Sequence, residues 1–323
     1  TRRFTLSSCA TSLFLIIYMS IVVQGVTKFY GQQKALDNVS FEIKTGEVVG
    51  FLGPNGAGKS TMMKIITGFI PPTSGNVLVN GIPVTDESKD IRKAIGYLPE
   101  NNPLYPEMYV REYLSFCASL YKTGKSIKKQ IDNIIETTGL AQEQKKKIGS
   151  LSKGYRQRVG LAQALIHDPE VLILDEATTG LDPNQIIEIR NLIRDAGKEK
   201  TVMLSTHIMQ EVEAICNRVI IIDKGVVIAD EDKNEIYSRI KQARQEILVE
   251  FDSEPGEDLI KKITFAGSVR RIRQNTLIVE SRGEEDIRPA IFAFAVNNNL
   301  TVLSLQKKEN NLEEVFRVLT NSQ

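Results

Sequence analysis

The chain has 323 residues, of which 41% are hydrophobic, enough to bury one large domain and a smaller second one. Its 41 Lys and Arg residues balance 40 Asp and Glu residues. The resulting net charge of +1 excludes a bulk electrostatic attraction to nucleic acid or to an anionic membrane surface. The three cysteines, Cys9, Cys117 and Cys216, lack CxxC and metal-ligand spacing, which is typical of a reducing compartment.

The N-terminal stretch carries two arginines and then a mostly apolar run from Ala10 to Val23. The run is shorter than the about 20 residues that a membrane-spanning helix needs. We expect the folded protein to start at Met19, with residues 1–18 forming an extension that is not part of the native protein. The alternative is that this segment tethers the chain to a membrane.

Short apolar runs bounded by Gly, Asn or Pro predict buried strands, and they are Ile21 to Val26, Val48 to Leu52, Val77 to Val79, Val171 to Leu174, Val202 to Leu204, and Val219 to Ile222. A helical pattern, Pro183 to Ala196, lies between two of them and has proline at its start. This alternation predicts a parallel α/β core. The dipeptide Asn80-Gly81 predicts a hairpin in a small antiparallel sheet, and Tyr105 to Ile166 is expected to be helical.

The pattern changes after Asp230 to short strand and helix segments in the order β-α-β-β-α-β-α. We therefore predict a core domain over residues 19–230 and a C-terminal α+β domain over residues 231–323. The polar stretch Glu231 to Lys241 is expected to be a helical linker.

A glycine-rich segment, "GPNGAGKST", follows the apolar strand "EVVGFL" and precedes a helical pattern, which is the context of a phosphate-binding loop. Glycines allow backbone N–H groups to curl round phosphates, a lysine adds a point charge, and a serine hydroxyl suits Mg²⁺. The predicted nucleotide-binding residues here are Gly53, Asn55, Gly56, Gly58, Lys59, Ser60 and Thr61.

Polar residues follow two other predicted strands, at the edge of a parallel sheet where ligands bind. Asp175 and Glu176 end the run "VLILDE", and we expect Asp175 to hold Mg²⁺ and Glu176 to activate the attacking water. His207 closes "TVMLSTH" and is expected to contact the γ-phosphate. Tyr30, just after the first strand, could stack on a base or could equally be an ordinary surface or core aromatic.

The segment "LSKGYRQR" places Ser152 and Gly154 before a helix start, where unpaired N–H groups and the helix dipole attract an anion. With Tyr30, "IGYLPE", "LILDE", "GLDP" and "STH", it forms an ordered set of motifs that resembles the nucleotide-binding subunit of ABC transporters. From Met19 to the tail "NLEEVF", the chain looks closest to drug-exporter-type ATPases and to the gliding-motility-associated ATPase.

The resemblance implies a P-loop NTPase cassette with a mixed sheet core, an antiparallel β subdomain and an α-helical subdomain. It implies that Ser152 and Gly154 contact ATP held by a second copy, and that Asp182 couples the two sites. Two departures stand out. Glu100 replaces the family's usual glutamine and is expected to face Mg²⁺. Lys153 and Tyr155 replace a glycine and a glutamine of the signature.

These residues predict an ATPase that uses ATP and Mg²⁺, forms a homodimer and drives a separate integral membrane permease, exporter-like or associated with gliding motility. We expect it to be cytoplasmic and peripheral on the cytoplasmic face of the inner membrane, with no nucleic-acid partner. The permease is expected to dock after Glu100 and on Tyr105 to Ile135. A soluble cassette ATPase acting on ribosomes or DNA is the alternative. A degenerate cassette is disfavoured because Lys59, Asp175, Glu176 and His207 are all present.

Overall fold

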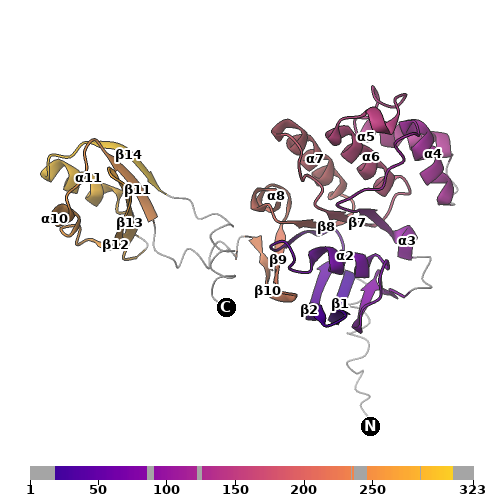
Figure 1. The fold of residues 1–323 in the computed structure, drawn as a ribbon, viewed down its shortest axis with the longest axis horizontal. Coiled ribbons are helices and arrows are strands. Elements are labelled where there is room, and N and C mark those ends of the chain that lie inside the picture. Colours follow the sequence, from indigo (N-terminus) through magenta and orange to yellow (C-terminus); the bar gives the residue numbers. More distant parts are fainter. Residues whose placement is uncertain are drawn as a thin grey trace, which may run out of the picture. The chain divides into compact units, whose positions relative to one another are not determined.

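A computed structural model describes residues 19–85, 91–121, 126–233, 235, 246–283 and 285–307. The predicted N-terminal extension, most of the predicted linker and the predicted last helix lie outside these residues. The chain divides into two compact units, Thr1–Lys233 and Asn234–Gln323 (Figure 1). None of the helices in the described ranges combines the length and apolar character that crossing a bilayer demands.

The first unit is built on a six-stranded sheet with the strand order β10-β9-β3-β8-β7-β6. Its strands are β3 (Val48–Leu52), β6 (Ile95–Leu98), β7 (Val171–Asp175), β8 (Thr201–Thr206), β9 (Arg218–Asp223) and β10 (Val226–Asp232). Every residue of β3, β7 and β8 is buried, because layers cover both faces of the sheet. Neighbours from β6 to β9 are parallel and β10 pairs antiparallel with β9, so the sheet is mixed, as the resemblance of the motifs predicts.

The layer on one side of this sheet contains α2 (Lys59–Ile66) and an antiparallel sheet, while α7 (Pro183–Ala196) and α8 (Met209–Ile215) lie on the other side (Figure 1). The antiparallel sheet has the order β2-β1-β4-β5, with β1 (Met19–Tyr30), β2 (Gln33–Lys44), β4 (Ser74–Val79) and β5 (Ile82–Pro83). The predicted hairpin at Asn80-Gly81 is confirmed. Both residues have positive φ, 50° and 74°, as a type I′ turn requires.

Two details of this antiparallel sheet differ from the sequence prediction. The first strand is longer than Ile21 to Val26, and β2 was not predicted at all. In β2 the residues from Asn38 to Lys44 alternate between exposed and buried, because only one face of the strand packs on the core. A search for continuous apolar runs misses such a strand.

The predicted helical region is confirmed, and it has a hydrophobic core of its own. It contains α4 (Val110–Leu120), α5 (Ile127–Thr137) and α6 (Lys153–Leu165), with a 3₁₀ turn at Ile148–Ser150 before α6. The short helix α3 (Ile91–Ala94) leads into β6. Because α6 packs on β6 and on α4 and α5, this helical layer is joined to the edge of the main sheet.

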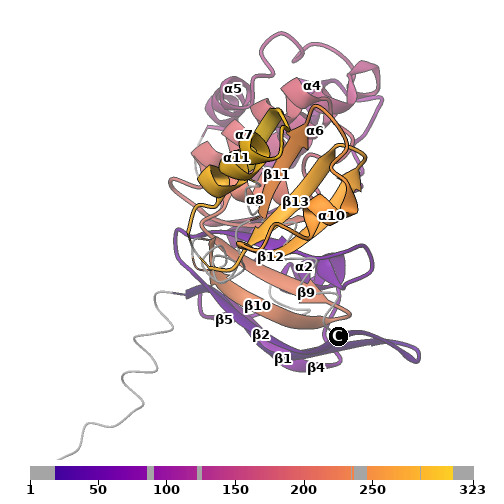
Figure 2. The same cartoon turned by 90° about the vertical axis from the view of Figure 1, so that its left-hand side faces the viewer.

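The second unit is a β-α-β-β-α-β fold of the ferredoxin-like kind. Its strand order is β12-β13-β11-β14, with all neighbours antiparallel. Helices α10 and α11 lie on the same face of the sheet (Figure 2), and side chains from both belong to the hydrophobic core of this unit. The elements are β11 (Glu246–Phe251), α10 (Glu257–Ile260), β12 (Ala266–Arg273), β13 (Thr276–Ser281), α11 (Arg288–Asn297) and β14 (Val302–Lys307).

Truncation of Phe251 to alanine is expected to destabilise the second unit by about 3–5 kcal/mol, because the ring is fully buried and its removal leaves a cavity. Hydrogen exchange of the β11 and β13 amides measures the loss. Phe292 is 57% exposed on α11, so Phe292→Ala is the matched control and should leave exchange unchanged. Equal protection in the two variants would contradict the packing described.

Candidate functional site

The loop between β3 and α2 is shaped by glycines at places where a side chain does not fit. Gly56 and Gly58 have positive φ, 83° and 104°. A Cβ at Gly53 would collide with the Ile222 carbonyl oxygen of β9, and one at Gly58 would lie 2.6 Å from the Ala35 oxygen. No side chain caps α2, so its first N–H groups and the positive end of its dipole face the loop. This geometry suits a phosphate.

Lys59 is the first residue of α2, and it is only 6% exposed. Its Nζ donates to the carbonyl oxygens of Gly53 at 2.8 Å and Pro54 at 3.2 Å, and it lies 3.7 Å from Glu176 Oε1. Burial lowers the pKa of this ammonium group, and the carboxylates of Glu176, Asp175 and Glu100 oppose the shift. The structure thus brings the predicted lysine together with three predicted acidic residues.

Asp175 is the last residue of β7 and is 2% exposed. Its Oδ1 is buried and has no hydrogen-bond partner among the residues that the structure describes. A buried carboxylate oxygen without a hydrogen-bond partner needs a ligand from outside the chain. The side chain therefore fits a hard cation, and the Ser60 hydroxyl and the Glu100 carboxylate, which acts electrostatically on Lys59, are oxygen donors of the same class.

Within the described ranges, no three His, Cys, Asp or Glu side chains are arranged to hold a metal ion by themselves. Mg²⁺ is usually held by one or two carboxylates together with substrate phosphates and water. The donors present therefore suit a metal that arrives with a nucleotide.

Glu176 is fixed by contacts with β8 and with its own turn. It has a positive φ of 53°, and its N–H donates to the Ser205 carbonyl at 2.9 Å. Its carboxylate accepts from Thr179 Oγ1 at 2.8 Å and lies 2.9 Å from His207 Nδ1 through both oxygens. A positive φ in a residue other than glycine is a strained backbone conformation, and such strain is typical of functional sites. The site holds a buried carboxylate between a lysine and a histidine, an arrangement that can activate a water next to a phosphate.

Sequence reasoning missed two side chains beside these carboxylates. Thr179 lies three residues after Glu176, and its hydroxyl donates to that carboxylate. The short spacing in the sequence is the one signal that could have indicated this contact. Tyr97 lies on β6, where burial and the nearby Asp175 and Glu100 carboxylates raise the pKa of its phenol. Tyr97 is close to Asp175 because β6 lies next to β7 in the sheet. This follows only from the strand order, which the sequence does not give.

The predicted signature residues lie apart from this cluster. Ser152 is the N-cap of α6, and its hydroxyl accepts from the Tyr155 N–H at 3.3 Å. A Cβ on the buried Gly154 would meet the Gln185 side chain of α7. The signature turn, residues 152–154, therefore packs beside the start of α7. By contrast, α2 packs on β2, β4, β7 and β8.

Asp182 is the N-cap of α7, and its Oδ1 accepts from the Gln185 N–H at 3.0 Å. The structure thus places Asp182 next to the signature turn of its own chain. Tyr30 ends β1 and is 48% exposed, with Lys28 Nζ 5.5 Å from its ring centre. Tyr30 pairs with Gln33 of the adjoining strand β2, which brings Ala35 against Gly58 of the phosphate-binding loop.

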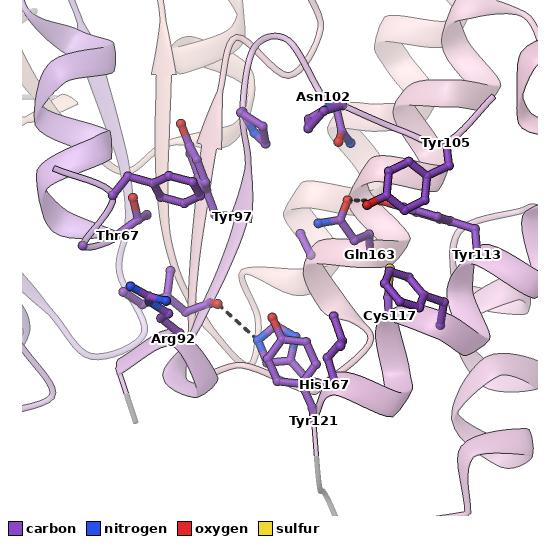
Figure 3. Close-up of a pocket in the computed structure, with 18 residues that line it drawn as sticks. Thr67, Arg92, Tyr97, Asn102, Tyr105, Tyr113, Cys117, Tyr121, Gln163 and His167 are labelled. Carbon is purple, nitrogen blue, oxygen red and sulfur yellow. Dashed lines mark hydrogen bonds between the residues drawn. The ribbon is translucent and has the colours of Figure 1, made fainter. Parts of the chain in front are cut away.

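A groove of about 590 Å³ lies between the α2–β6 side and the helical layer (Figure 3). Among the described residues, its lining includes six aromatic side chains and a single Lys, Arg, Asp or Glu residue, Arg92; the aromatic ones are Phe69, Tyr97, Tyr105, Tyr113, Phe116 and Tyr121. At its floor, His167 is stacked on Tyr121 and bonds the Ile95 carbonyl at 3.1 Å. Burial lowers the pKa of His167, so the imidazole stays neutral at neutral pH.

Comparisons with known proteins agree with these features. The family described as "ABC transporter" matches residues 36–179. The linearmycin resistance ATP-binding protein LnrL of Bacillus subtilis (strain 168) is 34% identical over 318 residues, covering 92% of this chain and 97% of that protein. The bacitracin transport ATP-binding protein BcrA of Bacillus licheniformis is 34% identical over 304 residues, with the same coverage.

Solved structures are similar over the first unit. The dimeric post-hydrolysis state of the ATP-binding cassette MJ0796, bound to ADP and Pi, is 30% identical with a TM-score of 0.61. It covers 66% of this chain and 98% of that one. The CbiO1 subunit from Clostridium perfringens, part of the transporter complex CbiONQ, is 31% identical with a TM-score of 0.61, covering 69% and 95%.

Proposed function

This chain belongs to the family of ABC transporter ATP-binding subunits, and from that premise we propose that two copies close around two Mg-ATP molecules and drive a separate permease. The chain is an ATPase subunit of an exporter-type system, as the motifs predict. The alternative of a cassette acting on ribosomes or DNA is not favoured. The gliding-motility role stays a prediction.

The observation that carries the proposal is the cluster at the carboxyl edge of the sheet, in which Lys59, Asp175 and Glu176 are buried and the more exposed His207 contacts Glu176. We assign Lys59 and the loop N–H groups to the phosphates, with Tyr30 against the base. Glu176 takes the proton of the attacking water, and His207 positions that carboxylate and faces the γ-phosphate. When bound, Mg²⁺ neutralises phosphate charge, and we assign Ser60, Asp175 and Glu100 as the residues on its side.

The second copy is needed because one chain leaves its signature turn away from its own phosphate-binding loop. Ser152 and Gly154 lie at the start of α6, on the helical layer, and α6 and α2 pack on different elements. We assign these two residues to the γ-phosphate of ATP held by the partner, with Asp182 linking the two sites. A ligand that bonds to both copies favours the closed dimer over the open one, so ATP binding shifts the two chains toward the closed conformation.

The aromatic groove is the surface that we assign to the permease. Phe69, Phe116 and Leu120 are 69%, 41% and 65% exposed there, and Arg92 is the one Lys, Arg, Asp or Glu residue among the described residues that line it. An exposed apolar groove of this kind can bind the apolar face of an amphipathic helix that a membrane protein presents. We propose that the chain works in this way at the cytoplasmic face of the inner membrane.

A charge placed in the groove is expected to separate the chain from its permease while leaving its own chemistry intact. In Leu120→Asp, co-purification of a multi-spanning membrane protein from detergent extract should fall at least about tenfold, because an ionised side chain cannot be buried unpaired. ATP binding by the isolated chain should be unchanged. Leu303→Asp is the matched control, since Leu303 is similarly exposed but lies on β14 of the second unit. Equal recovery with both variants would contradict the assignment.

A further inference from the structure

A fully buried carboxylate lies close to the catalytic cluster, and no ion pair joins it to another of the residues that the structure describes. Glu211 is 0% exposed, and neither of its oxygens has a hydrogen-bond partner among the residues that the structure describes. It occupies the third position of α8, where a glutamate often accepts from the N–H of the N-cap. That role is taken here, because the N–H of the N-cap residue Ile208 donates to Thr206 Oγ1 at 3.0 Å. Helix capping therefore does not explain Glu211.

A second unpartnered group lies on the helix packed against α8. Arg190 belongs to α7, which contacts α8, and its Nε is buried and also without a partner within the described part of the chain. Burial raises the pKa of Glu211. The neighbouring Thr206 hydroxyl and the Arg190 guanidinium oppose this shift, and Glu176 and His207 also act on it electrostatically. In the described part of the chain, Glu211 and Arg190 thus lie near each other with opposite charges and no ion pair between them, next to Glu176 and His207. Orphaned buried polar groups of this kind call for an explanation.

Helices α7 and α8 each begin beside a residue of the proposed site. In the proposed function, these residues move relative to each other when the dimer closes. Helix α7 starts at its cap Asp182, on the loop assigned to the partner's site, and α8 begins two residues after His207. We propose that Arg190 and Glu211 pair when two copies close around ATP, and that this pair positions His207 and Glu176 in response to the Asp182 loop. Glu211 is thus a positioning residue. This inference rests on the proposed function, since it requires the closed dimer.

Paired charges predict a specific pattern in a double-mutant cycle. Glu211→Gln and Arg190→Gln should each lower kcat about tenfold and leave the KM for ATP within about twofold, because each removes the pair without touching the nucleotide. The double variant should be no slower than either single one. Arg190→Lys, which keeps the charge, should recover most of the rate. A merely structural role would not give non-additive kcat losses at constant KM.

The controls separate folding and dimerisation from the pair itself. Lys198 follows α7 and is paired only at the surface with Asp195, so Lys198→Gln should turn over at the parent rate. Thermal unfolding of each variant detects simple destabilisation. Additive losses in the double variant, or single variants as fast as the parent, would overturn the pair. If the parent itself formed no dimer with ATP, the proposed function would fail instead, so the two failures are distinguishable.

Discussion

Replacement of Glu176 by glutamine is expected to lower ATP turnover about 10²- to 10⁴-fold, the usual cost of losing a positioned base. The amide keeps the size of the side chain and can still accept from Thr179, but it cannot take a proton from water. Lys59 and the phosphate-binding loop are untouched, so ATP should still bind. Because hydrolysis is what reopens the proposed dimer, the variant should accumulate as an ATP-bound dimer, which size-exclusion chromatography with scattering detects.

A matched control for this experiment is Glu136→Gln, which makes the same chemical change at an exposed position of α5. It should turn over and dimerise like the parent. Glu176→Gln protein that hydrolyses ATP at the parent rate would remove Glu176 from the role of base. Slow protein that stays monomeric with ATP would keep the base and remove the link between hydrolysis and reopening.

The sequence predicts the main sheet well, because β3, β7 and β8 are buried on both faces and therefore read as continuous apolar runs. Asp175 and His207 stand at the ends of two such runs, so their place at one sheet edge follows from the prediction that the strands are parallel. Strand β2 escapes this reasoning because its buried and exposed residues alternate. The antiparallel β10 escapes it too, since strand direction depends on a tight turn at Lys224 and Gly225, both with positive φ.

Contacts between distant segments are what the sequence cannot supply. The packing of Gly154 against Gln185 joins the signature turn to α7, and no local pattern shows it. The same holds for the aromatic groove, whose lining comes from the turn after α2 and from α3, β6, α4 and α6, and is formed only when these elements pack. The residue types of the site could thus be predicted, while its connections to the rest of the fold required the structure.

Two variants that are each inactive should regain activity when mixed, if each nucleotide is completed by two copies. Ser152→Arg places a bulky side chain at the start of α6 and should abolish turnover in its own homodimer. Lys59→Ala removes the lysine from the phosphate-binding loop and should also be inactive. A mixed dimer contains one site with an intact Lys59 from one copy and an intact Ser152 from the other. Random pairing of equal amounts makes about half of the dimers mixed, so roughly a quarter of the parent's sites should be restored.

The quantitative outcome discriminates between the possible arrangements of the signature turn. Were Ser152 to serve the nucleotide of its own chain, a mixed dimer would contain one defective residue in each site and no activity would return. A second mixture, Ser152→Arg with Glu176→Gln, should behave as the first does, because Glu176 lies with Lys59 on the same side of the nucleotide. By contrast, Lys59→Ala mixed with Glu176→Gln should stay inactive, since each copy carries a defect in the half-site that it supplies itself. Restoration in this last mixture would contradict the grouping of Lys59 and Glu176 into one half-site.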